Sequence, residues 1–505
     1  MTTLMLAFRT SCACAVLSVL PCLPLRATDQ PTALPAKPAI GLAGAFPAPG
    51  AVNVCPDTPL RLTFDSPPVL GTAGKIQIHD AADDRVVETI DVISPTALKT
   101  IGGYPNFKYY PVIITGNVAA IYPLNGELAC GKTYYVTIDA GVFKNGTDDY
   151  ASLDQAAAWR FTTRSAPPAA GAEKYTVAAD GTGDFCTVQG ALDFVPEGNT
   201  KPVTIFIRKG VYNELIFLVG KDDIRLIGED RKQTVIAYAN NDKFNHNSAN
   251  PYSSGGSPVM GKGNIYRRGV LLAHYVKNLV LANLTVRNTT PHGGSQAEAV
   301  ILNGSPEARA YLTDLDLSSY QDTLQINGQA YVSNCYIEGD VDFMWGTGPC
   351  FFENCICRSL NSTVAKGGYY TQIRNPPASH GYVYLHCTFD GAPGVTGNFL
   401  SRIQPVRFPE SEVVLLDCVL TDAVGGLGWF YQKNPDKEEG VVGDVSRLHF
   451  WEYHSHDASG KPIEMKQRIT GARELRQPDD AALIANYSDP TWVLGHGWKP
   501  KPVQP

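Results

Sequence analysis

Residues 332–337 (VSNCYI) recur in varied form along the C-terminal two thirds of the chain, and they decide the fold. Each copy is a short β-type run with Asn, Asp or His in its third position and apolar residues in its fourth and sixth. The copies are 281–286 (LANLTV), 312–317 (LTDLDL), 332–337, 352–357 (FENCIC), 384–389 (YLHCTF) and 415–420 (LLDCVL). Their fourth positions lie 31, 20, 20, 32 and 31 residues apart, which leaves no room for helices between them. The sequence therefore predicts a solenoid, in its simplest form a right-handed parallel β-helix.

Four of these copies carry cysteine in the fourth position: Cys335, Cys355, Cys387 and Cys418. Residues at the same position of successive turns face the same way, so we expect an interior stack of small apolar side chains. Disulfide bonds between them are the less favoured alternative.

The region before the solenoid has a different pattern. Residues 41–164 contain short alternating runs, such as 60–64 (LRLTF) and 159–163 (WRFTT), broken by Gly, Pro and Asp. This pattern predicts a small β-sandwich, and its ends resemble the bacterial Ig-like modules that accompany secreted enzymes. Cys55 and Cys130 are its only cysteines, so we expect them to pair, with two buried thiols as the alternative. The protein is thus predicted to be all-β, with a linker at 165–172 (SAPPAAGA) and a separately folding β-helix at 173–505.

The N-terminus has the features of a secretory signal peptide at residues 1–27. Arg9 supplies the positive charge, an apolar run extends from Ser11 to Leu23, and Ala27 is a small residue suited to cleavage. Pro21 argues against a lipoprotein signal at Cys22. A Pro/Ala-rich linker at 28–40 follows, and we expect the mature protein to be extracellular or periplasmic.

Composition excludes several classes of function. The 505 residues carry a formal charge of −7 and no long Lys/Arg run, which argues against nucleic-acid binding. No later stretch reaches 18 apolar residues, so no membrane span is expected. Histidines and cysteines do not show zinc-site spacing, so we expect neither a metal nor a cofactor. A monomer is the expected state.

Two aspartates hold equivalent places on neighbouring turns. Asp322 lies seven residues beyond Leu315, and Asp342 lies seven beyond Cys335. Adjacent parallel strands are about 4.8 Å apart, and two carboxylates at that distance do not both ionise cheaply. One protonated and one ionised carboxyl can serve as an acid beside a nucleophile or base. The alternative is two aspartates that cap turns on an exposed face.

The surrounding residues resemble the pectin methylesterases. That family's GxYxE, QAVAL, QDTL, DFIFG and LGRPW motifs correspond in order to GVYNE (210–214), QAEAV (296–300), QDTL (321–324), DFMWG (342–346) and a degraded LSR (400–402). The resemblance implies a parallel β-helix that hydrolyses the C6 methyl ester of galacturonate units in pectin.

The resemblance also implies a role for each residue of the site. Asp342 would be the nucleophile that forms an acyl-enzyme. Asp322 would protonate the departing methanol and then activate water. Gln296 and Gln321 would donate hydrogen bonds to the oxyanion, and Arg402 would hold Asp342 ionised and oriented.

Three departures from the motifs concern the substrate side. Ser401 and the residues after Arg402 replace the Gly and the Pro-Trp of LGRPW, so a sugar-stacking tryptophan is missing. Glu298 replaces Val, which brings an acid near the cleft unless it points outward. Trp345 replaces Phe and offers a larger platform. We expect Val341, Phe343 and Trp345 to contact the polysaccharide.

Other functions fit the sequence less well. A serine esterase would carry GxSxG, which is missing, and a Ca²⁺-dependent lyase would need more clustered carboxylates. An inverting glycosidase would need its carboxyls about 6.5–9.5 Å apart. The predicted function is therefore a secreted carboxylic ester hydrolase acting on methylated homogalacturonan. A β-helix that acts on another polysaccharide ester, or only binds polysaccharide, is the alternative.

Overall fold

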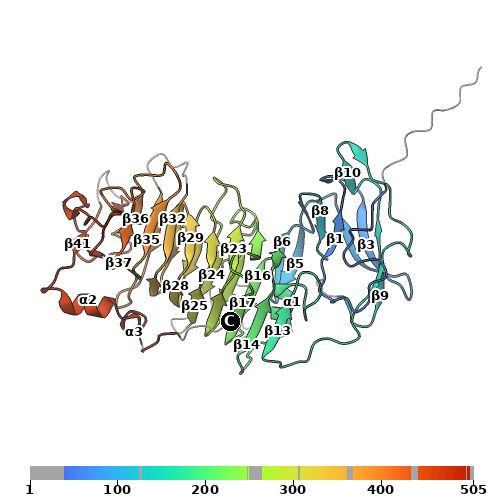
Figure 1. Ribbon diagram of the computed structural model, residues 1–505, viewed down its shortest axis with the longest axis horizontal. Coiled ribbons are helices and arrows are strands. Elements are labelled where there is room, and N and C mark those ends of the chain that lie inside the picture. Colours follow the sequence, from blue (N-terminus) through green and yellow to red (C-terminus); the bar gives the residue numbers. More distant parts are fainter. Residues whose placement is uncertain are drawn as a thin grey trace, which may run out of the picture.

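The computed structural model of the protein describes residues 39–123, 128–246, 248–249, 264–304, 308–360, 368–433, 442–495 and 497–500. The predicted signal peptide (1–27) and nearly all of the linker predicted at 28–40 lie outside these residues. A sandwich and a long parallel β-helix lie end to end along the long axis of the molecule, and helices are few and short (Figure 1). The all-β prediction is confirmed. Within the described ranges, no helix is long and apolar enough to cross a membrane.

The N-terminal sandwich is built from antiparallel strands around its own apolar core. Leu62, Ile78 and Phe161 are buried there, and Trp159 Nε1 donates a hydrogen bond to the carbonyl of Pro47 at 2.8 Å. The sheets are β1 (Leu60–Thr63), β8 (Val118–Ile121) and β7 (Val112–Thr115); β11 (Asp148–Asp149), β10 (Phe143–Asn145) and β2 (Val69–Leu70); and β12 (Arg160–Thr162), β9 (Thr133–Ile138), β3 (Lys75–Asp80) and β4 (Val86–Asp91).

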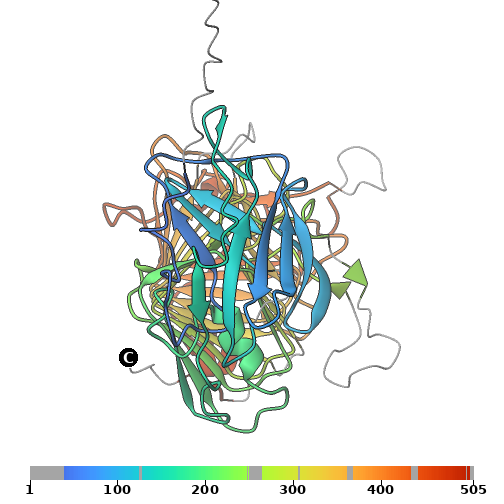
Figure 2. The ribbon, with the colours of Figure 1, turned by 90° about the vertical axis from the view of Figure 1, so that its right-hand side faces the viewer.

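Three parallel sheets form the walls of the right-handed β-helix, and their strands lie behind the sandwich in Figure 2. The first contains β13 (Lys174–Val177), β14 (Val203–Ile207), β17 (Ile224–Gly228), β22 (Leu279–Ala282), β25 (Arg309–Thr313), β28 (Gln329–Ser333), β31 (Cys350–Glu353), β34 (Tyr382–Leu385), β37 (Glu412–Leu416), β40 (His449–Tyr453) and β41 (Arg473–Glu474). The second contains β15 (Gly210–Tyr212), β18 (Thr234–Tyr238), β23 (Thr285–Asn288), β26 (Asp316–Ser318), β29 (Tyr336–Gly339), β32 (Ile356–Ser359), β35 (Thr388–Gly391) and β38 (Val419–Leu420). The third contains β16 (Ile216–Val219), β21 (Leu271–His274), β24 (Val300–Asn303), β27 (Leu324–Ile326), β30 (Val341–Gly346), β33 (Tyr369–Ile373), β36 (Phe399–Ile403) and β39 (Trp429–Tyr431).

Short elements complete the β-helix. α1 (Val188–Phe194) packs at its N-terminal end, where Thr187 caps the helix by accepting a hydrogen bond from the backbone N–H of Gly190. α2 (Ala481–Tyr487) and α3 (Pro490–Val493) bring Tyr487 and Val493 onto the outer face of the first sheet, over Phe351. Two further short elements are the 3₁₀ turn Met465–Gln467 and the small hairpin of β19 (Ser248–Ala249) and β20 (Asn264–Ile265).

Each recurring six-residue stretch turns a corner between two sheets, so it is not the single strand that the sequence suggested. In residues 332–337, β28 ends at Ser333 and β29 begins at Tyr336. The polar third residue has a left-handed backbone, which Asn and Asp adopt more readily than most residues. These residues and their φ angles are Asn283 (55°), Asp314 (54°), Asn334 (55°), Asn354 (54°), His386 (54°) and Asp417 (51°). The repeat therefore marks a turn between two strands. The residue that follows the polar third residue points into the core.

The cysteine stack is confirmed. Cys335, Cys355, Cys387 and Cys418 are buried free thiols on successive turns, and the backbone N–H of Cys355 lies 3.4 Å from Cys387 Sγ. They belong to the interior apolar cluster of the β-helix. Burial raises the pKa of all four thiols, so they remain protonated and act as small apolar side chains.

One hairpin from the predicted sandwich region belongs to the β-helix core. β5 (Ala97–Ile101) and β6 (Tyr104–Tyr109) lie at the junction between the two parts (Figure 1). The rings of Tyr104 and Phe107 pack 4.7 and 5.4 Å from the ring of Phe217 on β16. This hairpin covers the N-terminal end of the β-helix. Independent folding of residues 173–505 stays a prediction, and truncation would expose this apolar end.

The predicted pairing of Cys55 with Cys130 is wrong. Both are free thiols, and Cys55 instead lies beside Cys186, at the start of the β-helix. The sequence analysis paired the two cysteines because they share one predicted domain. In the structure, the sandwich docks through the segment that carries Cys55, so its neighbour comes from outside that domain.

Candidate active site

Asp322 and Asp342 face each other on neighbouring turns of the third sheet. β27 and β30 pair in parallel with Leu324 opposite Met344, and Gln321 bridges to Val341 just before them. The backbone N–H of Asp322 also donates to the carbonyl of Val341 at 3.1 Å. This register places the two aspartates opposite one another, as their equal offsets predicted. Both have positive φ, 65° and 49°, and both are at least 94% buried, with exposed fractions of 6% and 5%.

Arg402 fixes one of the two carboxylates. It lies on β36, two strands along the sheet from β30, and its Nε donates to both oxygens of Asp342 at 2.8 and 3.0 Å. Arg402 Nη2 makes a further contact with Asp342 Oδ2. Burial raises the pKa of Asp342, whereas the Arg402 guanidinium opposes that rise. A two-pronged guanidinium contact of this kind favours the carboxylate form of Asp342.

Asp322 has the opposite electrostatic environment. Burial, together with the negative charges of Glu298 and Asp342, raises its pKa well above the ordinary value for aspartate. Arg268 Nη2 reaches Asp322 Oδ2 at only 3.3 Å and offsets part of this rise. Asp342 is thus the carboxyl whose charged form a guanidinium favours, and Asp322 is the one whose neighbours favour the protonated form.

The two predicted oxyanion donors come from neighbouring turns, where the backbone N–H of Ala297 donates to the carbonyl of Gln321 at 3.3 Å. Gln321 immediately precedes Asp322, and Gln296 lies just before the segment that leads into β24; both side chains are half-buried. Gln321 and Val341, the residues just before the two aspartates, line a cavity of about 100 Å³ that neither Asp322 nor Asp342 lines. The predicted contact of Val341 with substrate stays a prediction.

Two protein-family models match the chain. Residues 174–482 match the family model described as pectinesterase, and residues 36–163 match that of a bacterial Ig-like domain. The chain belongs to the pectinesterase family. The family match covers the β-helix, including all five predicted site residues.

Individual pectinesterases are distant in sequence. Pectinesterase 31 of Arabidopsis thaliana is 28% identical over 317 residues, which cover 62% of this chain and 90% of that protein. Pectinesterase 1 of Citrus sinensis is 28% identical over 330 residues, 64% of this chain but only 51% of that protein. Among solved structures, pectin methylesterase PemA from Erwinia chrysanthemi (24% identity, TM-score 0.51, 65% and 98% of the two chains) and the carrot enzyme (21%, 0.50, 62% and 91%) share the fold.

Glu298, the acidic departure from the pectinesterase motif, does not point outward. It is fully buried, and Arg268 Nε lies 3.0 Å from each of its carboxylate oxygens. Arg268 Nη2 bonds to Glu298 Oε1 at 2.8 Å and also reaches Asp322. Arg268 therefore joins the replacement acid to the proposed general acid. Sequence reasoning missed Arg268, because it lies outside every motif and only the fold brings it to Glu298.

Phe343 does not contact substrate, so that prediction is wrong. It is fully buried in the interior cluster, with its ring 5.3 Å from that of Tyr370. The left-handed backbone of Asp342 and a register irregularity after Val341 interrupt the alternation of β30. Phe343 and Met344 consequently both face the core.

Trp345 lies outside that core cluster and near the two aspartates, although only 8% of it is exposed. The guanidinium carbons of Arg268 and Arg374 lie 5.8 and 5.2 Å from its ring centre. It therefore packs beneath the charged groups, and its part in substrate binding stays a prediction.

Three other aromatic side chains lie next to Arg402. The Arg402 guanidinium sits 4.6 Å from the ring centre of Tyr369, which packs 5.7 and 5.6 Å from Phe399 and Phe430. Phe399 and Phe430 are half-buried and come from neighbouring strands β36 and β39. The sequence did not indicate this aromatic group, because its grouping requires the strand register.

Proposed function

We propose that this protein hydrolyses the methyl esters of galacturonate units in pectin, with Asp342 as the nucleophile. The observation that carries the proposal is the buried pair itself. The Arg402 guanidinium binds Asp342 and favours its carboxylate, whereas burial and neighbouring negative charge favour the protonated form of Asp322. An ester needs both groups, since its carbonyl must be attacked and its methoxide must be protonated.

The reaction proceeds in two halves. An oxygen of Asp342 attacks the ester carbonyl carbon, and Gln296 and Gln321 donate hydrogen bonds to the oxyanion that forms. Donors of this kind are each worth about 10²–10³ in rate. The tetrahedral intermediate collapses, the carbon–oxygen bond to the methoxy group breaks, and Asp322 gives it a proton. Methanol leaves, and an anhydride links the sugar to Asp342.

The second half restores the enzyme. Asp322, now ionised, takes a proton from water as the water attacks the acyl carbon of the sugar. The anhydride bond breaks, releasing the Asp342 anion and a galacturonic acid group, which loses its proton to the solvent. Asp322 ends protonated, so both aspartates regain their starting states.

The aromatic side chains near the site are the candidates for contact with the substrate. Tyr369, Phe399 and Phe430 lie beside Arg402, where the tryptophan of LGRPW is missing from this chain. We propose that the half-buried rings of Phe399 and Phe430 take over its contact with a sugar ring. The predicted signal peptide supports action outside the cytoplasm, and we propose that the chain acts as a monomer on polymeric pectin.

Methanol release from highly methylated pectin tests this function. Wild type should release methanol without lowering the viscosity of the pectin, and Asp342→Asn should release none. Asp314→Asn is the matched control, because Asp314 also has a left-handed backbone but lies at a corner outside the site. Chain cleavage by wild type, or equal methanol release by Asp342→Asn, would contradict the proposal.

A further inference from the structure

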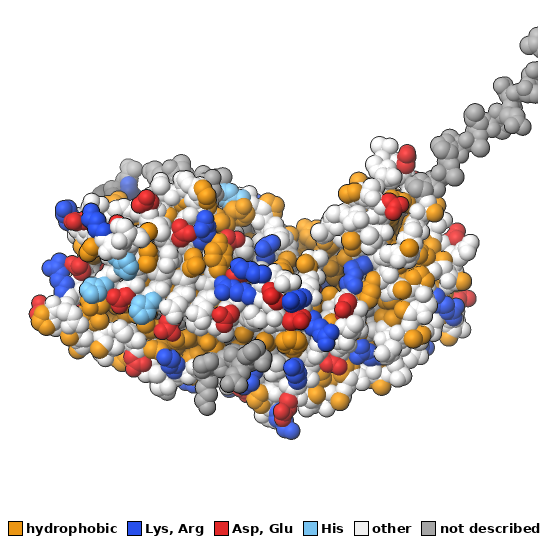
Figure 3. Space-filling view, viewed as in Figure 1, with side chains coloured by type: hydrophobic (Ala, Val, Ile, Leu, Met, Phe, Trp, Pro, Cys, Tyr) orange, Lys and Arg blue, Asp and Glu red, His pale blue; other side chains and the backbone are white. Residues whose placement is uncertain are grey.

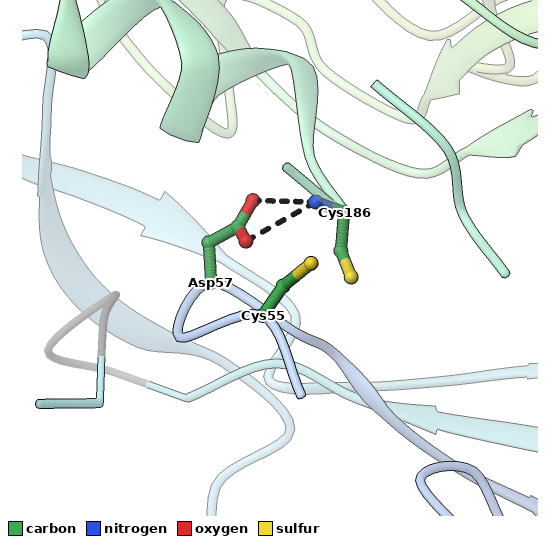
Figure 4. A group of neighbouring side chains, drawn as sticks. All are labelled: Cys55, Asp57 and Cys186. Atoms are coloured by element: carbon green, nitrogen blue, oxygen red, sulfur yellow. Dashed lines mark hydrogen bonds between the residues drawn. The ribbon is translucent and has the colours of Figure 1, made fainter. Parts of the chain in front are cut away.

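Two buried thiols from different parts of the molecule meet where the sandwich docks on the β-helix. Cys55 belongs to the sandwich, and Cys186 lies two residues before α1 at the start of the β-helix. Their sulfur atoms lie side by side within 4.8 Å of each other (Figure 4). On the face seen in Figure 3, a notch separates the two parts, so the contacts that hold them together are confined to the junction.

The backbones of the two cysteines are held together independently of the sulfur atoms. Asp57, two residues after Cys55, accepts hydrogen bonds from the backbone N–H of Cys186 at 3.1 and 2.9 Å. It also accepts from the backbone N–H and the hydroxyl of Thr187, at 2.8 and 2.7 Å. These four bonds fix the segment of Cys186 against the sandwich, which keeps the two side chains in reach of each other.

Arg164 gives this pair a property that the interior cysteine stack lacks. Its Nη2 lies 2.7 Å from Cys55 Sγ, while its Nη1 donates to the carbonyl of Asp184 at 2.7 Å. Contact with Cys186 and the Arg164 guanidinium lower the pKa of the Cys55 thiol although burial opposes this, whereas the pKa of Cys186 and of the stacked cysteines is raised. A thiolate is the form that attacks a disulfide, so Cys55 is the more reactive thiol.

We propose that Cys55 and Cys186 form a disulfide bond that locks the sandwich onto the first turn of the β-helix. The electron acceptor is an external disulfide, either on an oxidising protein or in glutathione disulfide. The Cys55 thiolate attacks one of its sulfurs, forming a mixed disulfide and releasing one thiolate. Cys186 then loses its proton and attacks the Cys55 sulfur, which releases the second thiolate. Two protein thiols are oxidised and one external disulfide is reduced.

The burial of Cys55 and Cys186 determines when their disulfide can form. Both thiols are inaccessible once the parts have docked, so the exchange takes place while the chain is folding. The finished bond is then shielded from reductants.

A metal ion fits this cluster less well, although Cys55, Asp57 and Cys186 could supply three ligands. Both oxygens of Asp57 already accept hydrogen bonds, and a cation bound to Cys55 would lie against the Arg164 guanidinium. Positive charge beside a thiolate favours oxidation chemistry over a second cation.

Peptide mapping of the full chain tests the cross-link. The protein is refolded in a glutathione and glutathione disulfide buffer, alkylated under denaturing conditions without reductant, and digested. We expect a peptide that joins Cys55 to Cys186, two fewer alkylated thiols than in the reduced protein, and a Tm about 5 °C higher than after reduction. Cys130→Ser is the matched control and should keep the linked peptide, whereas Cys55→Ser should lose it.

Three results would overturn the inference. One is full alkylation of both cysteines after oxidative refolding, and another is a linked peptide that joins Cys55 to Cys130. The third is one equivalent of Zn²⁺ retained by the refolded chain with both thiols still reduced. Mapping of the wild type decides between these results even if the Cys55→Ser chain does not fold.

Discussion

Two buried carboxyl groups in the same β-helix, those of Asp322 and Glu412, have pKa values shifted in opposite directions. Around Asp322, burial and two neighbouring acids raise the pKa. Glu412 on β37 is just as buried, yet its pKa is lowered to about 2. Its carboxylate lies 2.9 and 2.8 Å from Nδ1 of His380 and His449, and the Tyr487 hydroxyl donates to it at 2.6 Å.

The difference separates a reactive site from a structural one. Glu412 has a donor for every direction in which it could hydrogen-bond, and through Tyr487 it attaches α2 to the outer face of the first sheet. Asp322 has one contact to Arg268 at 3.3 Å and faces another acid. Burial depth alone therefore does not identify a reactive carboxyl; the supply of hydrogen-bond donors does.

The largest expected effect is on catalysis at Asp322. Asp322→Asn should lower kcat by about 10²–10⁴ on methylated pectin, because the neutral amide cannot transfer a proton. The same change should leave the protein at least as stable at pH 7. The raised pKa of Asp322 means that ionisation costs stability above the ordinary aspartate pKa, and asparagine does not ionise. Methanol assays and urea denaturation measure the two effects, and a less stable but active variant would reverse the assignment.

Glu412→Gln should show the converse behaviour, with a large loss of stability and unchanged kcat. The lowered pKa of Glu412, about 2 against an ordinary value of 4.5, corresponds to about 3 kcal/mol of stability. This contribution is fully present above pH 4.5 and is lost as the pH falls toward 2. Urea denaturation between pH 3 and 7 should therefore give a flatter pH dependence for Glu412→Gln than for wild type. Parallel curves would exclude this role of Glu412.

A smaller effect concerns the acid that replaces valine in QAVAL. We expect kcat/KM to fall on the acid side as Asp342 is protonated and on the basic side as Asp322 loses its proton. Because the Glu298 charge raises the pKa of Asp322, Glu298→Gln should move the basic limb to lower pH. Glu338→Gln is a control, since Glu338 on β29 bonds to Ser318 outside this cluster. A wild-type rate that is flat from pH 4 to 9, or an unmoved limb in Glu298→Gln, would argue against the coupled pair.

The smallest effect is expected at the aromatic group beside Arg402. Phe430→Ala removes a half-buried ring and should raise KM for pectin by about 3- to 10-fold with little change in kcat. Phe206→Ala is the matched control, because this half-buried ring on β14 lies in the first sheet and packs against Lys174. Equal KM values for wild type and Phe430→Ala would exclude Phe430 from substrate binding.

The catalytic pair could be found from the sequence, but its supporting groups could not. Asp322 and Asp342 each lie seven residues beyond a buried corner residue, and this constant offset becomes contact when turns stack. Arg268 comes from a segment with no such repeat, and its contact with Glu298 depends on how two separate turns pack. Phe343 was misplaced because alternation along a strand assumes a regular backbone, and Asp342 interrupts it.

The sequence by itself determined the all-β class, the β-helix, the cysteine stack and the adjacency of Asp322 and Asp342. Each of these follows from local spacing, because a solenoid places equivalent residues of successive turns together. Only the tertiary structure decided the Arg268–Glu298 pair, the burial of Phe343, and the meeting of Cys55 with Cys186. These depend on packing between segments that no period relates, where contact is set by the shape and charge of the docked surfaces.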